Sequence, residues 1–585
     1  MKLYRADLDA IKAFAIIAVV LYHMGLLKSG YLGVDIFFVI NGFFILPSMC
    51  MLFTQKNDGE NGGLLPFWVK RIMRLWPLIL IASLFSLCVG YYGMLPDDYE
   101  NLSEAVIASN LFSENILEAI TTKNYWDIQN EYKPLMHMWY VGVLVEFYIF
   151  TPIVLWLANR IARRKGVDTN KYCVMLVYIL TLLSFFYYLS PLSEGPGRFY
   201  YLPARFWEIA LGGLVALNFN KLRNLQVSNN KLLNTVISLL LLFIICVGLV
   251  WPYYHPTPAL IITAFLTTFL LFANPENNIF KKILTWQPLC VIGKMSFSIF
   301  VWHQVLLAFY RYFVSEENTI SFVLLFWCLV LFVSCISYLF VEKKIRPTRR
   351  SFALAASFMV LIAIPSTAIF LHAGVVRDVP ELNISFSNVH RHMHAEYVDR
   401  IYSLDKGFSP NSKLYKVLVV GDSYARDWAN ILLESSVSDI IEISYSFSYN
   451  DSIASRIKQC DVLFSRGLKS KIPLYVWDEL RHNRVFGIGT KEFGTCNGSI
   501  YRKRHDSDYF DQMSLPEAKV IEDYGKEKME WGEYYIDMLK PVSNNEGLVR
   551  IFTPNHKFIS QDCRHLTEEG AKYYASLIQF DRFFE

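Results

Sequence analysis

A series of apolar stretches, each near 20 residues long, fills the chain from residue 8 to about residue 373. A helix needs about 20 apolar residues to cross the ~30 Å hydrocarbon core of a bilayer, so each stretch is a candidate membrane span. Hydrophobic residues make up 54% of the 585 residues and charged residues only 18%, which excludes an ordinary soluble protein. We predict about eleven spans, at 8–27, 31–53, 75–95, 137–158, 172–190, 204–219, 232–251, 258–273, 289–313, 319–341 and 352–373.

The distribution of basic residues predicts how these spans are oriented. Lys and Arg gather in alternate loops, for example in KKIRPTRR at 343–350, and such loops face the cytoplasm. The N-terminus is then cytoplasmic, and an odd number of spans places everything after residue 373 outside. The net charge of +4 follows from these loops and does not indicate a nucleic-acid partner. The bilayer is the first partner implied, and the pattern gives no oligomeric state.

Two ionisable residues, Lys12 and His23, stand out in the first span. A charge near the middle of a bilayer costs about 2.5–3.5 kcal/mol on insertion scales, so such residues are seldom there without a function. Their separation returns them to one helical face, about 16 Å apart along the axis. Lys12 could then hold an anionic donor at the surface, with His23 as a buried base. The alternative is a neutral, packed His23 and a Lys12 that snorkels.

From about residue 376 the chain becomes polar and reads as a soluble α/β domain. We divide the chain into a ten-span membrane domain at 1–346, an additional span at 347–376, a linker at 377–411 and an exported domain at 412–585.

In the exported domain a continuous apolar strand, KVLVV, runs into Gly421, Asp422 and Ser423 and then into a helical pattern. A serine at this point lies in the crevice where α/β sheets bind ligands, and the helix amino terminus favours developing negative charge. It could equally be a plain helix N-cap.

Asp562 and His565 are three residues apart near the C-terminus, just before a helix that we expect Thr567 to cap. An aspartate that orients an imidazole, and an imidazole that takes a proton, are the two helpers that a serine nucleophile needs. The sequence therefore predicts a Ser423–His565–Asp562 site. The alternative is a surface Asp and His pair.

The sequence gives weaker indications of a metal site and of a disulfide. His390, His392 and His394 could bind a metal if their segment were extended, but no Cys or carboxylate nearby completes a ligand set, so we expect no metal site. Cys460, Cys496 and Cys563 lie in the exported part, where one disulfide and one free thiol are possible.

The chain resembles the acyltransferase-3 family of integral-membrane acyltransferases, fused to an exported SGNH-hydrolase-like domain. The membrane-domain resemblance is carried by YRADLDAIKAFAIIAVVLYHMG, GYLGVDIFFVINGFFI, FWVKRIMRLWPL, HMWYVGVLVEFYIFTPIVLW, SIFVWHQVLL and SYLFVEKKIRP. In the exported half it is carried by Gly421, Asp422 and Ser423 and by Asp562 and His565. The implied fold is a polytopic α-helical membrane domain followed by a three-layer α/β domain.

The resemblance also implies roles for single residues. Lys12 stands where the family has an arginine, so the charge is kept and the two-pronged donor is lost. With Arg71 and Arg74 it is a candidate for binding acyl-coenzyme A. Further membrane-domain candidates are Asp35, His137, Glu146 and His303.

The oxyanion donors are less clear. FGIGTKEFG at 486–494 offers Lys491 where an asparagine is expected, which leaves Gly421, Gly489 and Asn497 as candidates.

These features predict an O-acyltransferase, an O-acetyltransferase first of all, in a bacterial inner membrane. Acetyl-coenzyme A or another acyl-coenzyme A would be the donor substrate, with no permanently bound cofactor. The acceptor would be a hydroxyl of a cell-surface glycan such as an O-antigen, a capsule, an exopolysaccharide or peptidoglycan. The acyl group would pass from His23 to Ser423 and then to the sugar. Two rivals are an exported acyl esterase and a non-enzymatic transporter or glycan-binding protein.

Overall fold

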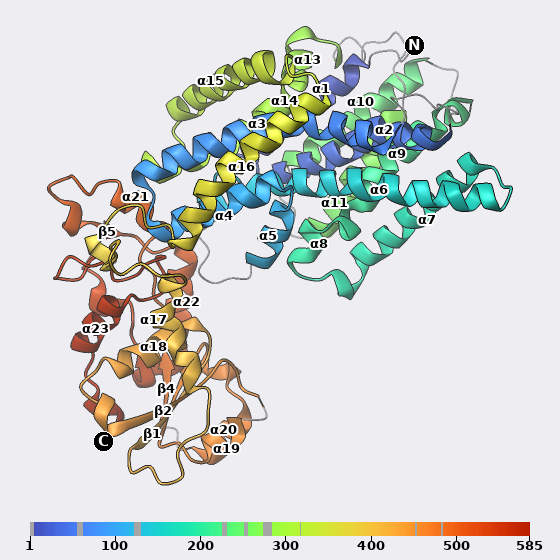
Figure 1. Ribbon diagram of the computed structural model, residues 1–585. Coiled ribbons are helices and arrows are strands. Elements are labelled where there is room, and N and C mark those ends of the chain that lie inside the picture. The colour runs from blue at the N-terminus through green and yellow to red at the C-terminus, as the bar shows by residue number, and fades with distance from the viewer. Residues whose placement is uncertain are drawn as a thin grey trace.

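The computed structural model describes residues 5–54, 63–121, 130–224, 231–250, 256–272, 284–315, 317–450, 453–480 and 484–584. Figure 1 shows a helical region beside a smaller α/β region, and α16 leads from one to the other. The long helices of the first region are α1 (Ala6–His23), α2 (Gly33–Thr54), α3 (Leu64–Gly93), α6 (Trp139–Arg164), α7 (Thr169–Leu189), α9 (Leu202–Asn224), α10 (Lys231–Val250), α11 (Pro256–Phe272), α14 (Ser296–Phe313), α15 (Ile320–Ser337) and α16 (Arg349–Leu371). Shorter helices are α4 (Pro96–Asn110), α5 (Glu114–Thr121), α8 (Pro196–Tyr200) and α13 (Gln287–Lys294).

A helix occupies each of the eleven predicted ranges, but not every helix is long and apolar enough to cross a membrane. Among the described residues six helices are, or up to seven if α13 and α14, which meet at 67°, form one bent span. Helix α1, for example, carries Asp7, Asp9 and Lys12. The protein is a multi-pass membrane protein, and the count of eleven crossings stays a prediction.

Helices α2 and α9 pack closely because glycines line their contact. A Cβ on Gly42 would overlap the carbonyl group of Ile209, and a Cβ on Gly212 would overlap that of Val39. Small residues let helix backbones approach in a membrane, where apolar burial alone gives no preference for helix over lipid. This contact fixes α9 against the second helix.

The C-terminal region is built on a five-stranded parallel sheet in the order β2-β1-β3-β4-β6. Its strands are β1 (Tyr415–Val420), β2 (Ile441–Ser446), β3 (Val462–Arg466), β4 (Val485–Ile488) and β6 (Tyr535–Ile536). A separate antiparallel pair joins β5 (Met513–Ser514) to β7 (Val549–Arg550). The strand predicted from KVLVV is confirmed as β1.

Helices cover both faces of this sheet, because side chains alternate along β1. Val417 and Val419 pack with α18 (Ser423–Leu433) and α23 (Glu568–Leu577). Leu418 and Val420 pack on the other side with α19 (Ala454–Ile457), α20 (Leu474–Glu479) and α22 (Ala518–Trp531). Thr567 caps α23 by accepting a hydrogen bond from the Gly570 amide, as the sequence predicted.

The segment between the two regions does not form the extended strand that a metal site at the HRHMH run would need. His392 has φ +66° and precedes the short helix α17 (Met393–Asp399). His390 bonds Glu396, whereas His394 bonds Gln561 and the carbonyl of Ala373. The side chains therefore diverge, and within the described ranges no three His, Cys, Asp or Glu residues are placed to share a metal ion.

The α/β region contacts the end of the helical region where α3 and α14 finish and α4 begins. The Gln561 amide donates to Asp97 Oδ2 at 3.2 Å, and Tyr132 donates to Thr495 Oγ1 at 3.3 Å. Helix α21 (Asn497–Tyr501) packs on α14, where Gly498 leaves room for the ring of Tyr312. The loop that carries Asp562 and His565 is therefore attached to the helical region by its own first residues.

Candidate active site

Ser423 is the first residue of α18, directly after β1 and at the carboxyl edge of the sheet. The N-cap is Asp422, whose side chain accepts from the Tyr424 amide at 3.0 Å, so the alternative that Ser423 caps the helix is wrong. The Ser423 side chain is buried, and its Oγ has no hydrogen-bond partner in the described part of the chain. Its hydroxyl is uncommitted.

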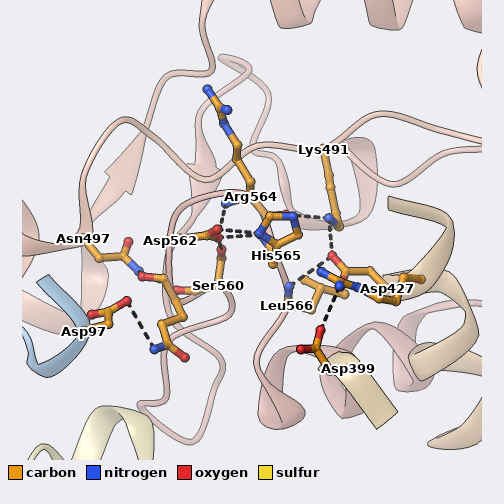
Figure 2. A network of polar contacts seen from close by, with 12 residues as sticks. Asp97, Asp399, Asp427, Lys491, Asn497, Ser560, Asp562, Arg564, His565 and Leu566 are labelled. Carbon is orange, nitrogen blue, oxygen red and sulfur yellow. Dashed lines mark hydrogen bonds and ion pairs between the residues drawn. The ribbon is translucent and has the colours of Figure 1, made fainter. Parts of the chain in front are cut away.

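The Asp562 and His565 side chains meet, as Figure 2 shows. Asp562 Oδ2 contacts His565 Nδ1, and Asp562 Oδ1 accepts from the amides of Arg564 and His565 at 3.0 and 2.7 Å. Burial raises the pKa of the Asp562 carboxyl, but the His565 imidazole and these amides outweigh burial and hold that pKa below its ordinary value. The His565 side chain is fully buried, so the pair is not a surface pair.

A buried ion pair holds this loop against α18. Lys491 Nζ lies 2.6 Å from Asp427 Oδ2 and donates to the Arg564 carbonyl at 2.5 Å, and both side chains are 1% exposed or less. Asp427, one turn after Ser423 on α18, also accepts from the Leu566 amide at 3.1 Å. Figure 2 shows Lys491 pointing toward the imidazole of His565. The Lys491–Asp427 ion pair and these hydrogen bonds thus connect α18 to the loop that carries His565.

The predicted oxyanion donors are already occupied. The Gly421 amide donates to the Ser446 carbonyl and the Gly489 amide to the Ile536 carbonyl, each at 3.0 Å. Asn497 uses its amide group on the carbonyls of Ser560 and Gln561. The donors of Gly421, Gly489 and Asn497 thus hold parts of the fold together, and their oxyanion role stays a prediction.

None of the three cysteines of the α/β region forms a disulfide. Cys460, Cys496 and Cys563 are buried. Cys563 lies between Asp562 and His565, has φ +68° and donates its thiol hydrogen to Asn497 Oδ1 at 3.2 Å. Burial raises the pKa of Cys563, which keeps the group a neutral thiol.

In the helical region three histidines form a row. The ring of His303 lies 5.2 Å from that of His23 on one side and 5.2 Å from that of His137 on the other, centroid to centroid. His23 is the last residue of α1, and its carbonyl accepts from Arg311 of α14 at 2.6 Å. Because Tyr312 follows Arg311 and touches α21, His23 lies toward the end of the bundle that carries the α/β region.

The basic candidates lie at the opposite end of the bundle. Lys12, near the start of α1, is 3.3 Å from Asp9 Oδ1 and within electrostatic range of Arg74 on α3. Arg71 stacks on the ring of Phe67, and its Nε is buried with no partner among the described residues. Arg71 is also within electrostatic range of Arg74, so the three cations lie near one another.

The other two membrane-domain candidates, Asp35 and Glu146, are bonded to buried side chains. Asp35 binds Arg205 at 3.0 Å, and Arg205 also binds Glu208 at 2.8 Å, all fully buried. Glu146 accepts from Asn115 at 2.9 Å. Sequence reasoning missed Arg205 and Glu208, although two charges three residues apart in an apolar span were a signal for them.

Comparison with known proteins identifies the family of the helical region. The profile of the acyltransferase domain family, acyltransferase-3, matches residues 5–342. The chain belongs to the acyltransferase-3 family. That match covers His23, His137 and His303 and ends before α16.

Relatives of this acyltransferase-3 protein are found in Staphylococcus aureus. O-acetyltransferase OatA of strain MRSA252 is 27% identical over 393 residues, which is 62% of each chain. Putative O-acetyltransferase SAS0844 of strain MSSA476 is 27% identical over 361 residues, 59% of this chain and 57% of the relative. The alignments thus span about three fifths of these relatives. The search of solved structures found no match.

Proposed function

We propose that this protein transfers an acyl group, an acetyl group first of all, from acyl-coenzyme A to a hydroxyl of a cell-envelope polysaccharide. Family membership supports the reaction class, and the relatives named O-acetyltransferases support acetyl as the group. The proposed location is a bacterial inner membrane, with the N-terminus in the cytoplasm and the α/β region outside.

One observation carries the proposal. The Asp562–His565 loop is hydrogen-bonded to the acyltransferase-3 region through Gln561 and Asp97. A triad that served only a separate soluble reaction would have no need of this contact. The attachment supports a path on which an acyl group that leaves the helical region reaches this loop.

The donor would bind at the other end of the bundle. Lys12, Arg71 and Arg74 supply positive charge for the phosphates of coenzyme A, and arginine suits bidentate phosphate contacts. The unpartnered Nε of Arg71 supports this use. The acyl end of the donor would then point along α1 toward His23.

The proposed second step is acyl transfer through Ser423. His565 takes the proton of Ser423 Oγ as the oxygen bonds the acyl carbon, and Asp562 stabilises the imidazolium that forms. The bond between the acyl carbon and its carrier in the helical region breaks, and the imidazolium returns the proton to that carrier. His565 then takes the proton of a sugar hydroxyl as the sugar oxygen bonds the acyl carbon, and passes it to Ser423 Oγ as the bond from the acyl carbon to Ser423 breaks. Ser423 is 6% exposed and His565 0% exposed. Family membership supports transfer over the esterase alternative. Family membership argues against a transporter.

The test uses membranes that contain the full-length protein, radiolabelled acetyl-coenzyme A and the surface polysaccharide of the host. Ser423→Ala should lower the label on polysaccharide by at least about 10³-fold, as loss of a serine nucleophile does elsewhere. Ser576→Ala, an exposed serine on α23, is the matched control and should change nothing. Wild-type labelling by Ser423→Ala would exclude the α/β site from the transfer path.

A further inference from the structure

The backbone fixes the proton positions of two buried histidines in the acyltransferase-3 region. His303 Nδ1 lies 2.6 Å from the Phe300 carbonyl and 3.2 Å from that of Ile299. His137 Nε2 lies 3.2 Å from the Val301 carbonyl. A carbonyl oxygen only accepts, so each of these nitrogens carries the hydrogen. The other nitrogen of each ring must then be a lone pair.

Both lone pairs are buried and unused. His303 Nε2 and His137 Nδ1 are inaccessible to solvent and have no hydrogen-bond partner within the described ranges. A buried acceptor without a donor costs free energy, and such groups in native proteins call for a functional explanation. The centroids of the two rings are 5.2 Å apart, so the two unpartnered nitrogens lie in one small region of the bundle. That site offers acceptors and calls for a ligand that donates hydrogen bonds.

A small hollow lies between α4, α5 and the segment at 132–135, a few residues before His137. Its wall includes Asp98 and Leu102 of α4, Glu118 of α5, and Lys133 and Leu135. His137 follows Leu135 by two residues, and the Lys133 carbonyl accepts from Gln304, the neighbour of His303, at 3.2 Å. The segment at 133–135 therefore has the hollow on one side and residues next to the histidine pair on the other.

We propose that His303, rather than His23, is the proton acceptor of the first transfer step, and that His137 and His303 together bind the hydroxyl group that receives the acyl group from the donor. This inference rests on the proposed function. The hydroxyl O–H bond breaks as its oxygen bonds the acyl carbon, and His303 Nε2 takes the proton. The carbon–sulfur bond breaks, coenzyme A leaves as a thiolate, and the imidazolium then protonates that sulfur. His137 Nδ1 orients the hydroxyl-bearing molecule.

The test removes each lone pair and keeps each backbone bond. His303→Asn retains a donor at the Nδ1 position, and His137→Gln retains one at the Nε2 position. His372→Asn is the matched control, because His372 Nδ1 also bonds a carbonyl one turn earlier, that of Ala368 at 2.8 Å, but its ring is exposed. Full-length protein in nanodiscs receives acetyl-coenzyme A and surface polysaccharide, and release of the coenzyme A thiol is measured.

His303→Asn should slow thiol release by about 10²–10⁴-fold, the usual range for loss of a general base. His137→Gln should slow it less, and His372→Asn should match wild type. Added imidazole should restore part of the activity of His303→Ala, which a purely structural role would not allow. Retention of wild-type release by His303→Asn, or absence of rescue, would overturn the inference. If Ser423→Ala still abolishes transfer in that case, the proposed function stands; if it does not, both fail.

Discussion

The two imidazole sites of this protein differ in what holds the ring. His565 in the α/β region faces the carboxylate of Asp562, which can balance a positive ring. In the helical region, Nδ1 of His303 bonds the carbonyls of Ile299 and Phe300, which fix a tautomer without a full negative charge. The first arrangement suits a base that must become an imidazolium beside a serine. The second arrangement suits a neutral imidazole whose unprotonated nitrogen keeps its lone pair in one direction.

The difference also follows from the surroundings of each ring. A carboxylate in a membrane-spanning bundle is costly unless it is paired, as Asp35 is with Arg205. Backbone carbonyls near the start of α14 need no such pairing. A helix can therefore orient an imidazole with its own backbone, without the free-energy cost of a buried charge. A loop in a soluble domain can use a charged partner instead. The amides of Arg564 and His565 that bind Asp562 show the added support that this charge needs.

The largest expected effect comes from removing the charge of Asp562, the partner of His565. Asp562→Asn should lower acyl transfer to polysaccharide by about 10⁴-fold, because the imidazole loses both its orientation and its counter-charge. Initial rates with labelled acetyl-coenzyme A in membranes measure this change. Asp439→Asn, at an exposed aspartate before β2, should leave the rate unaltered. A fall of less than tenfold for Asp562→Asn would mean that the two imidazole sites do not differ as described.

A smaller effect tests the second charged neighbour of the His565 loop. Lys491→Met leaves Asp427 buried without its cation, and breaking such a pair costs about 3–5 kcal/mol. The opening free energy of the α/β region should fall by this amount, as measured from the urea dependence of thiol labelling at the buried Cys460 and Cys563. The control is Lys458→Met at the exposed Lys458–Glu479 pair, where the loss should stay below about 1 kcal/mol. Equal losses of opening free energy for the two variants would show that burial does not strengthen the Lys491–Asp427 pair.

Local patterns in the sequence predicted the parts of the fold and site that depend on local structure. The apolar run KVLVV became β1, Thr567 capped α23, and Asp562 met His565, because each involves residues close in the chain. The apolar stretches became helices for the same reason. The number of helices that cross the membrane was harder to predict, because α1 mixes charged and apolar residues and α13 bends against α14.

Contacts between distant segments could not be predicted in this way. Nothing near Lys491 in the sequence points to Asp427, and nothing near Gln561 points to Asp97, which is 464 residues away. The oxyanion candidates show the same limit: the sequence does not reveal that the amides of Gly421 and Gly489 bond carbonyls of other segments. The tautomers of His137 and His303 likewise depend on which carbonyls the packed helices bring to each ring.

The central claim is that an acyl group passes from the helical region to Ser423 before it reaches a sugar. The most direct measurement is mass spectrometry of the peptide that contains Ser423, taken after full-length protein in nanodiscs meets isotopically labelled acetyl-coenzyme A without polysaccharide. One labelled acetyl group should appear on Ser423, and it should disappear when polysaccharide is added. Labelled polysaccharide that forms while Ser423 never carries an acetyl group would contradict the account.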